Sequence, residues 1–464
     1  MASKVLRLKR SNLEPPIDPE DQDFTSPVTV AQPDLGGPMT QDQGELGPYF
    51  TRKYGSKHHS FWNVPWPLSY EKEILDMDVL LHQLLKEIKG LTVTDFSAGP
   101  PTKVLDLGTG LGAWVLDAAH QWPNTEFVGL DVVPIQPKLD RGLDPSIHAR
   151  IRWVTSNFLQ PLPFPDGSFD FVRGVNIARG VPESKWTFLF EEVARVLKQG
   201  GKVEIVAENI VFPYIPRAIS QATSPTIDTP VQPYFGLPRH EHILLEELFF
   251  DVFSSRFINV SPVRIIPSSM NISLRNVVEV PIHIPSKSPT TDNDPRGESI
   301  PTTPDYTHGK ASSIPFPAAS DSPCHLFDWA NELRAWQAVL GCKEAMWEEL
   351  EKKTKEDRDI KETGEDLLRS LPWSKEEREL RPRQLFELLF LRYEREMRKC
   401  ISISTALRKR LGWSAGKHEH EYGVFDENFD WLDRESRYFA GEDESTRHMS
   451  CFLAQKGDKF SLQV

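Results

Sequence analysis

A glycine-rich run near residue 110 restricts the possible folds of this 464-residue chain more than any other feature. The run reads Val-Leu-Asp-Leu-Gly-Thr-Gly-Leu-Gly over residues 104–112, so an apolar segment passes directly into three closely spaced glycines. Glycine permits positive φ angles and lets a ligand approach the main chain. A helical pattern follows over residues 113–121, so the run predicts a buried strand, a tight turn and a helix start. A structural turn can carry the same residues, so the loop alone does not identify a ligand.

The segment from residue 103 to about residue 213 alternates short β-rich runs with helical patterns. This alternation predicts a parallel sheet with helices on both faces. A second helix is predicted over residues 186–197, where Gly200 and Gly201 then terminate it. The predicted strands are residues 103–107, 126–130, 151–155, 169–173 and 202–207.

An acidic residue ends the second predicted strand. Asp131 lies 19 residues after Gly112 (131 − 112 = 19), where a carboxylate can accept hydrogen bonds from both ribose hydroxyls of a nucleoside. An isolated surface aspartate is the alternative. The loop has the spacing G-x-G-x-G, whereas dinucleotide folds use G-x-G-x-x-G to seat a pyrophosphate, which argues against a nicotinamide oxidoreductase.

Four landmarks, taken in order, resemble the class I S-adenosylmethionine (SAM)-dependent methyltransferases. The first two are the glycine loop, with Asp106 two residues before it, and Asp131. The third, NFLQPLPFPDGSFDFV at 157–172, resembles the family segment D-x-x-x-L-P-F-x-D-x-S-F-D with Asn157 in place of the first Asp. The fourth, FEEVARVLKQGGKV at 190–203, resembles the family's helix, L-K-P-G-G turn and fifth strand. The resemblance implies an α/β fold with a Rossmann-like class I methyltransferase sheet, helices on both faces and SAM as the cofactor.

The resemblance also implies roles for individual residues. The glycine loop wraps the methionine part of the cofactor, Asp131 accepts hydrogen bonds from the ribose, and Asn157 with Phe158 holds the adenine. The amide oxygen of an asparagine can still accept a hydrogen bond from the adenine amino group. The implied cofactor-binding residues are Asp106, Gly108, Thr109, Gly110, Gly112, Asp131, Val132, Asn157, Phe158 and Arg173.

Further segments resemble a fungal branch of this family. They are DVVPIQP at 131–137, GVPESKW at 180–186, WPL at 66–68 with the region 71–81, and KEAMW at 343–347. The branch includes secondary-metabolite methyltransferases and velvet-associated methyltransferase-like regulators. Two functions therefore stay open: methyl transfer to a small organic acceptor such as a fungal secondary metabolite, and nuclear regulation of secondary metabolism through protein partners.

The segment before residue 68 is dense in aromatic residues and histidines. His58 and His59 are candidates for a general base, with an ordinary surface pair of histidines as the alternative. Tyr54, Trp62 and Trp66 are candidates for lining the acceptor pocket, with core packing as the alternative.

Two positions at strand ends bear on the acceptor. No Asn-Pro-Pro-Tyr motif follows the fourth predicted strand, where residues 173–176 read Arg-Gly-Val-Asn, and this disfavours amide or nucleobase amino groups as acceptors. Glu208 ends the fifth predicted strand on the acceptor side and is the third candidate for a catalytic role. Apart from these candidates, the sequence identifies no catalytic residue.

The rest of the chain divides by composition and periodicity. The run SCFLAQK at 450–456 resembles the closing strand of these methyltransferases, so residues 449–456 are expected to lie antiparallel to the fifth strand. The helical patterns before it then form an insertion. The predicted divisions are a disordered tail (1–48), a helical lid (49–95), the SAM-binding Rossmann-like domain (96–284), a flexible linker (285–323), the helical insertion (324–447), and a return strand and tail (448–464).

Charge and cysteine content exclude some classes of protein. A formal net charge of −13 argues against nucleic-acid binding through a general basic surface. The four cysteines are far apart and form no C-x-x-C pair, so we expect reduced thiols and no metal site. No run reaches the length of a membrane span and no signal peptide is recognisable, so we expect a soluble cytoplasmic or nuclear protein without membrane contact.

Overall fold

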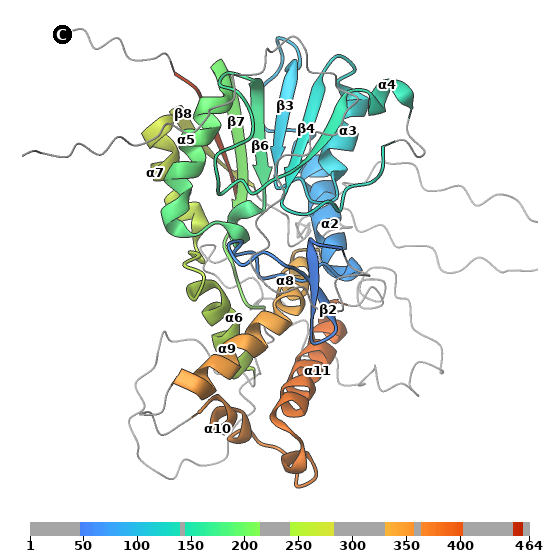
Figure 1. The fold of residues 1–464 in the computed structure, drawn as a ribbon, viewed down its shortest axis with the longest axis vertical. Coiled ribbons are helices and arrows are strands. Elements are labelled where there is room, and N and C mark those ends of the chain that lie inside the picture. Colours follow the sequence, from blue (N-terminus) through green and yellow to red (C-terminus); the bar gives the residue numbers. More distant parts are fainter. Residues whose placement is uncertain are drawn as a thin grey trace, which may run out of the picture.

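The computed structural model describes residues 47–139, 144–213, 242–282, 330–356, 363–401 and 449–457. The predicted tail (1–48), except its last two residues, and the predicted linker (285–323) lie outside these described residues. The described part consists of a seven-stranded sheet, helices on both of its faces, and a group of helices beyond one end of the strands (Figure 1).

The sheet has the strand order β5-β4-β3-β6-β7-β9-β8. Every neighbouring pair is parallel except those made by β9, which runs antiparallel to both β7 and β8. The fold class expected from the sequence is therefore confirmed. The strands are β3 (Lys103–Leu107), β4 (Glu126–Asp131), β5 (Ile151–Thr155), β6 (Phe169–Val175), β7 (Leu197–Glu208), β8 (Arg275–Ile282) and β9 (Met449–Gln455).

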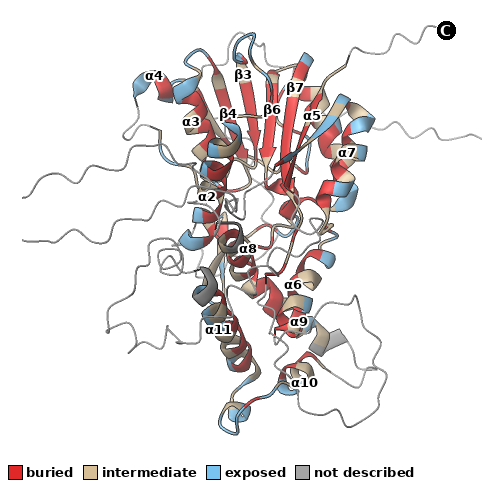
Figure 2. Ribbon diagram, turned by 180° about the vertical axis from the view of Figure 1, so that it is seen from behind, coloured by how far each residue is buried: buried red, intermediate tan, exposed pale blue. Residues whose placement is uncertain are grey.

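Apolar residues of the strands are buried on both faces of the sheet (Figure 2). On one face Leu105 packs in a cluster with α5 (Trp186–Val196) and α7 (Pro262–Ser273). On the other face Val104 packs with α3 (Ala113–Gln121). Helices on both sides explain why the strands are apolar throughout instead of alternating. Each such buried valine or leucine side chain stabilises the fold by about 1.5 to 3 kcal/mol.

The strand β9 lies inside the sheet, between β7 and β8. Cys451 pairs with Val206 of β7 and Phe452 pairs with Ile205. Phe452 packs in the cluster of α5 and α7, whereas Cys451 packs in the opposite cluster with α2 (Lys72–Lys89). The antiparallel closing strand expected at residues 449–456 is therefore present.

The helices between β8 and β9 form a second core with α6 (Ile243–Ser254) beyond the carboxyl ends of the strands (Figure 1). Phe249 of α6 belongs to this core together with Met346 and Phe386, although the sequence division placed α6 in the cofactor domain. The helices are α8 (Ala330–Gly341), α9 (Lys343–Glu356), α10 (Gly364–Arg369) and α11 (Pro382–Ile401). None of the helices in the described part of the chain is long and apolar enough to cross a bilayer.

The segment before α2 contains a β-hairpin that the sequence did not predict. The strands β1 (Phe50–Lys53) and β2 (Ser56–His59) pair antiparallel around a turn at Tyr54 and Gly55. Both turn residues have positive φ angles, 47° and 94°. Two-residue hairpin turns usually carry Asn-Gly or Asp-Gly, so the tyrosine conceals the signal. The predicted lid is therefore a hairpin followed by a helix, and the helix α2 begins at Lys72.

Candidate cofactor site and active site

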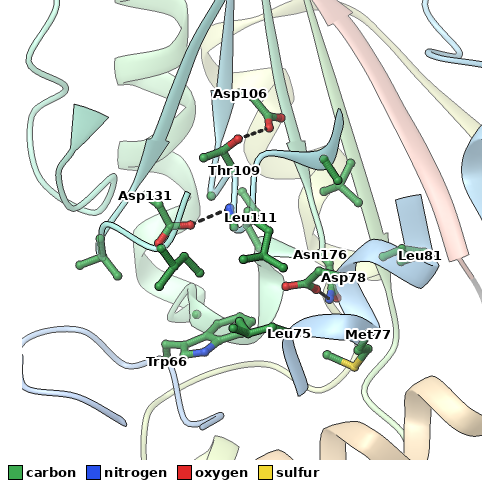
Figure 3. Close-up of a pocket in the computed structure, with 18 of the residues that line it drawn as sticks. Trp66, Leu75, Met77, Asp78, Leu81, Asp106, Thr109, Leu111, Asp131 and Asn176 are labelled. Atoms are coloured by element: carbon green, nitrogen blue, oxygen red, sulfur yellow. Dashed lines mark hydrogen bonds between the residues drawn. The ribbon is translucent and has the colours of Figure 1, made fainter. Parts of the chain in front are cut away.

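A cavity lies at the carboxyl ends of β3, β4 and β6, and α2 forms its opposite wall (Figure 3). In open α/β sheets, ligands bind at this edge of the strands. The cavity brings together nine of the ten residues that the family resemblance assigns to the cofactor, all except Gly112. Its apolar wall includes Trp66, Leu75 and Met77, at the end away from Asp106 (Figure 3).

The glycines of the loop have conformational and steric reasons to be glycine. Gly108, Gly110 and Gly112 have φ angles of 65°, 54° and 77°, which residues with a side chain adopt only at a cost. A Cβ at Gly108 would stand 2.7 Å from Ile177, and one at Gly112 would stand 2.6 Å from the Trp153 ring. Gly112 is therefore needed for packing at the start of α3, whereas Gly108 and Gly110 present bare backbone to the cavity.

Asp131, at the end of β4, is tied to the loop. Its carboxylate accepts hydrogen bonds from the backbone N–H of Gly110, at 2.8 Å, and of Val133, at 3.3 Å. Gln136 donates to the Gly110 carbonyl at 2.7 Å and so fixes the loop from the same side. Burial raises the pKa of Asp131 to about 6, against the opposing effect of these backbone hydrogen bonds. The acid lines the cavity beside Val132.

Asp106 and Arg173 belong to a buried ion cluster below the loop. Thr109 donates to Asp106 through Oγ1 at 2.8 Å, and a guanidinium nitrogen of Arg173 lies 3.6 Å from Asp106 Oδ1. Arg173 also lies 3.4 Å from Glu204 and stacks on the Trp114 ring at 4.5 Å. Burial raises the pKa of Asp106, while Arg173 and Thr109 act in the opposite direction. Arg173 therefore positions Asp106, and its charge is already balanced by two carboxylates.

Asn157 and Phe158 follow β5 and line the cavity. The Asn157 Oδ1 atom accepts a hydrogen bond from the Leu159 backbone at 2.9 Å. This bond uses one of the two acceptor positions of the oxygen, so the contact with an adenine amino group stays a prediction. Among the described residues, the buried Nδ2 atom has no hydrogen-bond partner. Phe158 lies 3.6 Å from the position that a Cβ on Gly108 would take, beside the loop.

The two histidines proposed as bases do not line the cavity. His59 accepts from the Phe61 backbone at Nδ1, so its Nε2 carries the proton and lies 2.9 Å from the Trp66 carbonyl. Burial lowers the pKa of His59 to about 4 and that of His58 to about 3. Both rings are neutral, His58 is buried and His59 is half-buried, and His59 joins the hairpin to the segment leading into α2.

Glu208, the third candidate for a catalytic role, is engaged by two arginines. Its Oε1 atom accepts hydrogen bonds from Arg179 at 2.8 Å and from Arg334 of α8 at 2.5 Å. Burial acts to raise the pKa of Glu208, but the two arginines outweigh it and the pKa is lowered. Glu208 is also absent from the cavity lining. It links the insertion to the sheet, and the candidate role in proton transfer has no geometric support.

The structure adds polar residues that the sequence did not single out. Asp78 and His82 project from α2 into the cavity wall, and Asn176 does so from the end of β6. Asp78 accepts from Asn176 Nδ2 at 3.4 Å (Figure 3). His82 Nε2 lies 2.6 Å from Asp117. The sequence feature that could have indicated Asp78 is an acid next to the buried face of α2, one residue after Met77. No group of three or more potential metal ligands occurs among the residues that the structure describes.

The cavity fits SAM by its chemistry. Bare glycine backbone and three carboxylates face a space that is otherwise mainly apolar, which suits a cationic amino acid joined to a nucleoside. The unpaired Asn157 Nδ2 and the Phe158 ring offer a hydrogen-bond donor and an apolar surface for a base. The ligand-free arrangement thus agrees with the cofactor that the sequence implied.

Comparison with known proteins places residues 104–201 in the family described as methyltransferase domain. Methyltransferase str3 of Strobilurus tenacellus is 38% identical over 75 residues, which are 16% of this chain and 24% of that protein. The secondary metabolism regulator laeA of Aspergillus niger is 32% identical over 89 residues, 19% of this chain and 24% of that protein. The demethylmenaquinone methyltransferase of Thermus thermophilus is 33% identical over 107 residues, 23% of this chain and 47% of that protein. The matches therefore span less than half the length of these relatives.

Among solved structures, phosphoethanolamine N-methyltransferase 2 of Haemonchus contortus in complex with SAM is similar at a TM-score of 0.33. It is 11% identical, and the match covers 91% of this chain and 61% of that one.

Proposed function

We propose that this chain, which carries a class I SAM-dependent methyltransferase domain of the fungal secondary-metabolism branch at residues 104–201, methylates a small organic acceptor. The observation that carries the proposal is the glycine loop facing Asp131 in a cavity at the carboxyl ends of the strands. A fungal secondary metabolite is the acceptor class that we favour, because relatives such as str3 are methyltransferases of a fungus.

In this function, different residues bind different parts of the cofactor. The loop at Gly108 and Gly110, with Asp106 and Thr109, holds the methionine part, and Asp131 with Val132 holds the ribose. Asn157 and Phe158 hold the adenine. SAM, when bound, supplies a methyl group on a positively charged sulfur. The protein's main contribution is alignment, because an in-line displacement gains most from holding the acceptor in the reactive geometry.

The acceptor would enter at the apolar end of the cavity. Trp66, Leu75 and Met77 form that end, and none of them can remove a proton. His59, which contacts the Trp66 carbonyl, uses both of its ring nitrogens in contacts with the backbone. An acceptor whose reacting atom needs no strong base at neutral pH fits this wall best, and its apolar body would pack against the indole ring.

Regulation of secondary metabolism through protein partners is the second candidate. The observation in its favour is the similarity to several proteins named as secondary metabolism regulators, including one from Coprinopsis cinerea that is 27% identical over 160 residues. The two functions predict different locations. A metabolic enzyme would act in the cytoplasm, whereas a regulator would gather in the nucleus, and a fluorescent fusion of the full chain distinguishes them.

Calorimetric titration of SAM into the full chain tests the proposal. We expect wild type to bind SAM and Gly110→Val to lose binding, because a β-branched side chain would fill space at the loop. Metabolite profiles of a strain without the gene should then contain a compound lacking one methyl group. Restoration of the normal profile by Asp131→Ala, a variant defective in SAM binding, would favour the regulatory function. Absence of SAM binding in wild type would exclude both methyl transfer and a SAM-dependent regulator.

A further inference from the structure

The three carboxylates that line the cavity differ in how many hydrogen bonds they accept. Asp106 accepts from Thr109 and faces Arg173, and Asp131 accepts from two backbone N–H groups. Asp78 accepts one long hydrogen bond, from Asn176 to Oδ1 at 3.4 Å. Within the described part of the chain, Oδ2 of Asp78 has no hydrogen-bond donor. Asp78 is therefore the acid in the cavity with an unused acceptor.

The unused oxygen faces the glycine loop. A Cβ on Gly110 would stand 3.6 Å from Asp78 Oδ2, so this carboxylate of the lid helix lies beside the loop. Figure 3 shows Asp78 beside Asn176, across the cavity from Asp131. The Asp78 side chain thus lies beside the part of the loop that would bind the methionine part of the cofactor.

The nearest arginines do not use this oxygen. Arg179 and Arg334 direct their guanidinium groups to Glu208, with which both form short hydrogen bonds. They lower the pKa of Asp78 from a distance, but burial has the larger effect and the pKa is raised. A half-buried carboxylate with one weak hydrogen bond is poorly satisfied, and a cationic group at hydrogen-bond distance would compensate it.

We infer that Asp78 binds the ammonium group of the methionine part of SAM. The inference rests on the proposed function, because it assumes that the cavity is a SAM site. It assigns part of cofactor recognition to the lid helix, outside residues 104–201. It also implies that the protein distinguishes SAM and S-adenosylhomocysteine from 5′-methylthioadenosine, which has the same nucleoside but no amino acid.

Titration calorimetry on the full chain with these three compounds tests the inference. Asp78→Asn should lower the affinity for SAM and S-adenosylhomocysteine about 10- to 100-fold and leave that for 5′-methylthioadenosine within about twofold. Asp76→Asn is the matched control on the same helix, since Asp76 is exposed and pairs with Lys72. Its affinities should equal those of wild type. Asp131→Asn should weaken all three compounds.

Unchanged SAM affinity in Asp78→Asn would overturn the inference while the proposed function stands, and so would an equal loss for all three compounds. Absence of SAM binding in wild type would overturn the proposed function itself. A second measurement does not depend on the variant's folding. Wild type should bind S-adenosylhomocysteine at least about tenfold more tightly than its analogue without the amino group, and equal affinities would contradict a role for Asp78.

Discussion

The wall of the cavity that carries the glycine loop comes from one stretch of chain, whereas the facing wall is assembled from distant segments. The loop, Asp131 and Phe158 all lie within residues 106–158, at the ends of adjacent strands. The facing wall contains Asp78 of α2 and Asn176 at the end of β6, which donates to Asp78. Arg334 of α8 lies behind this wall, where it donates to Glu208. The first wall can be recognised from residue spacing, but the second exists only after the chain has folded. The contrast means that the contribution of the loop wall to cofactor binding can be predicted from the sequence, whereas that of the facing wall requires the structure.

The largest effect is expected from Gly112→Ala in the loop wall. The left-handed backbone and the contact with Trp153 together should cost about 3 to 4 kcal/mol of unfolding free energy. Gly167→Ala is the control, because Gly167 also has a positive φ but has nothing within 4 Å of the added Cβ. It should lose only about 1 kcal/mol. Equal losses in denaturant unfolding would show that packing against Trp153 is not what demands glycine.

The facing wall should respond next, to Arg334→Met. The Arg334 side chain is 1% exposed and donates to Glu208, and loss of one partner of a buried ion pair should cost about 2 to 3 kcal/mol. Arg179 continues to donate to Glu208, which limits the loss. The double variant Arg334→Met, Glu208→Gln should be less stable than the single variant in the same unfolding experiment, because it leaves the buried Arg179 without its carboxylate partner. A single variant as stable as wild type would mean that the insertion is not anchored through this pair.

Asp131→Ala should weaken SAM binding by about 1 to 3 kcal/mol, because the ribose would lose a charged acceptor. The expected change in melting temperature is small, since the freed N–H groups of Gly110 and Val133 can bind water. Calorimetry gives the affinity and a thermal melt gives the stability. If the affinity is unchanged, the ribose is held elsewhere.

The binding of SAM should weaken by about tenfold as the pH falls from 7 to 5. The pKa of Asp131 is about 6, so its carboxylate loses the charged form in this range and with it the strong acceptor. The stability of the free protein should have the opposite dependence. The raised pKa means that the folded state holds the Asp131 proton more tightly than the unfolded state, so this contribution to stability is present at low pH and is lost as pH rises from about 4 through 6. Asp131→Asn should reduce both pH dependences; Asp78 and Asp106, whose pKa values are also raised, still titrate in this variant.

The smallest effect is expected from His59→Gln. The ring nitrogens of His59 contact the Phe61 and Trp66 backbones, so the change should cost about 1 kcal/mol of stability and leave SAM affinity within about twofold. A large loss of methyl transfer with normal SAM affinity would restore His59 as a catalytic candidate.

The sequence predicted the sheet and the loop wall well because the signals there are local. The glycine spacing, the acid 19 residues after Gly112 and the closing strand can each be read in a short window. The remaining features depend on tertiary structure. The hairpin turn at Tyr54 lacks the usual residues, and His59 resembles a base until its backbone partners are known. Asp78 could not be singled out, because an acid within an apolar stripe acquires meaning only when the loop that it faces is in place.

The position of β9 between β7 and β8 has a consequence for folding during synthesis. β8 ends at Ile282 and β9 begins at Met449, so 166 residues separate two strands that pair directly (449 − 282 − 1 = 166). As the chain leaves the ribosome, β8 has no strand to pair with until β9 follows, whereas α8–α11 can already form helices. Closure of so long a loop is slow compared with local helix formation. The nascent sheet therefore carries an open edge at β7 during that interval, and we expect chaperones that shield unpaired strands to bind it then.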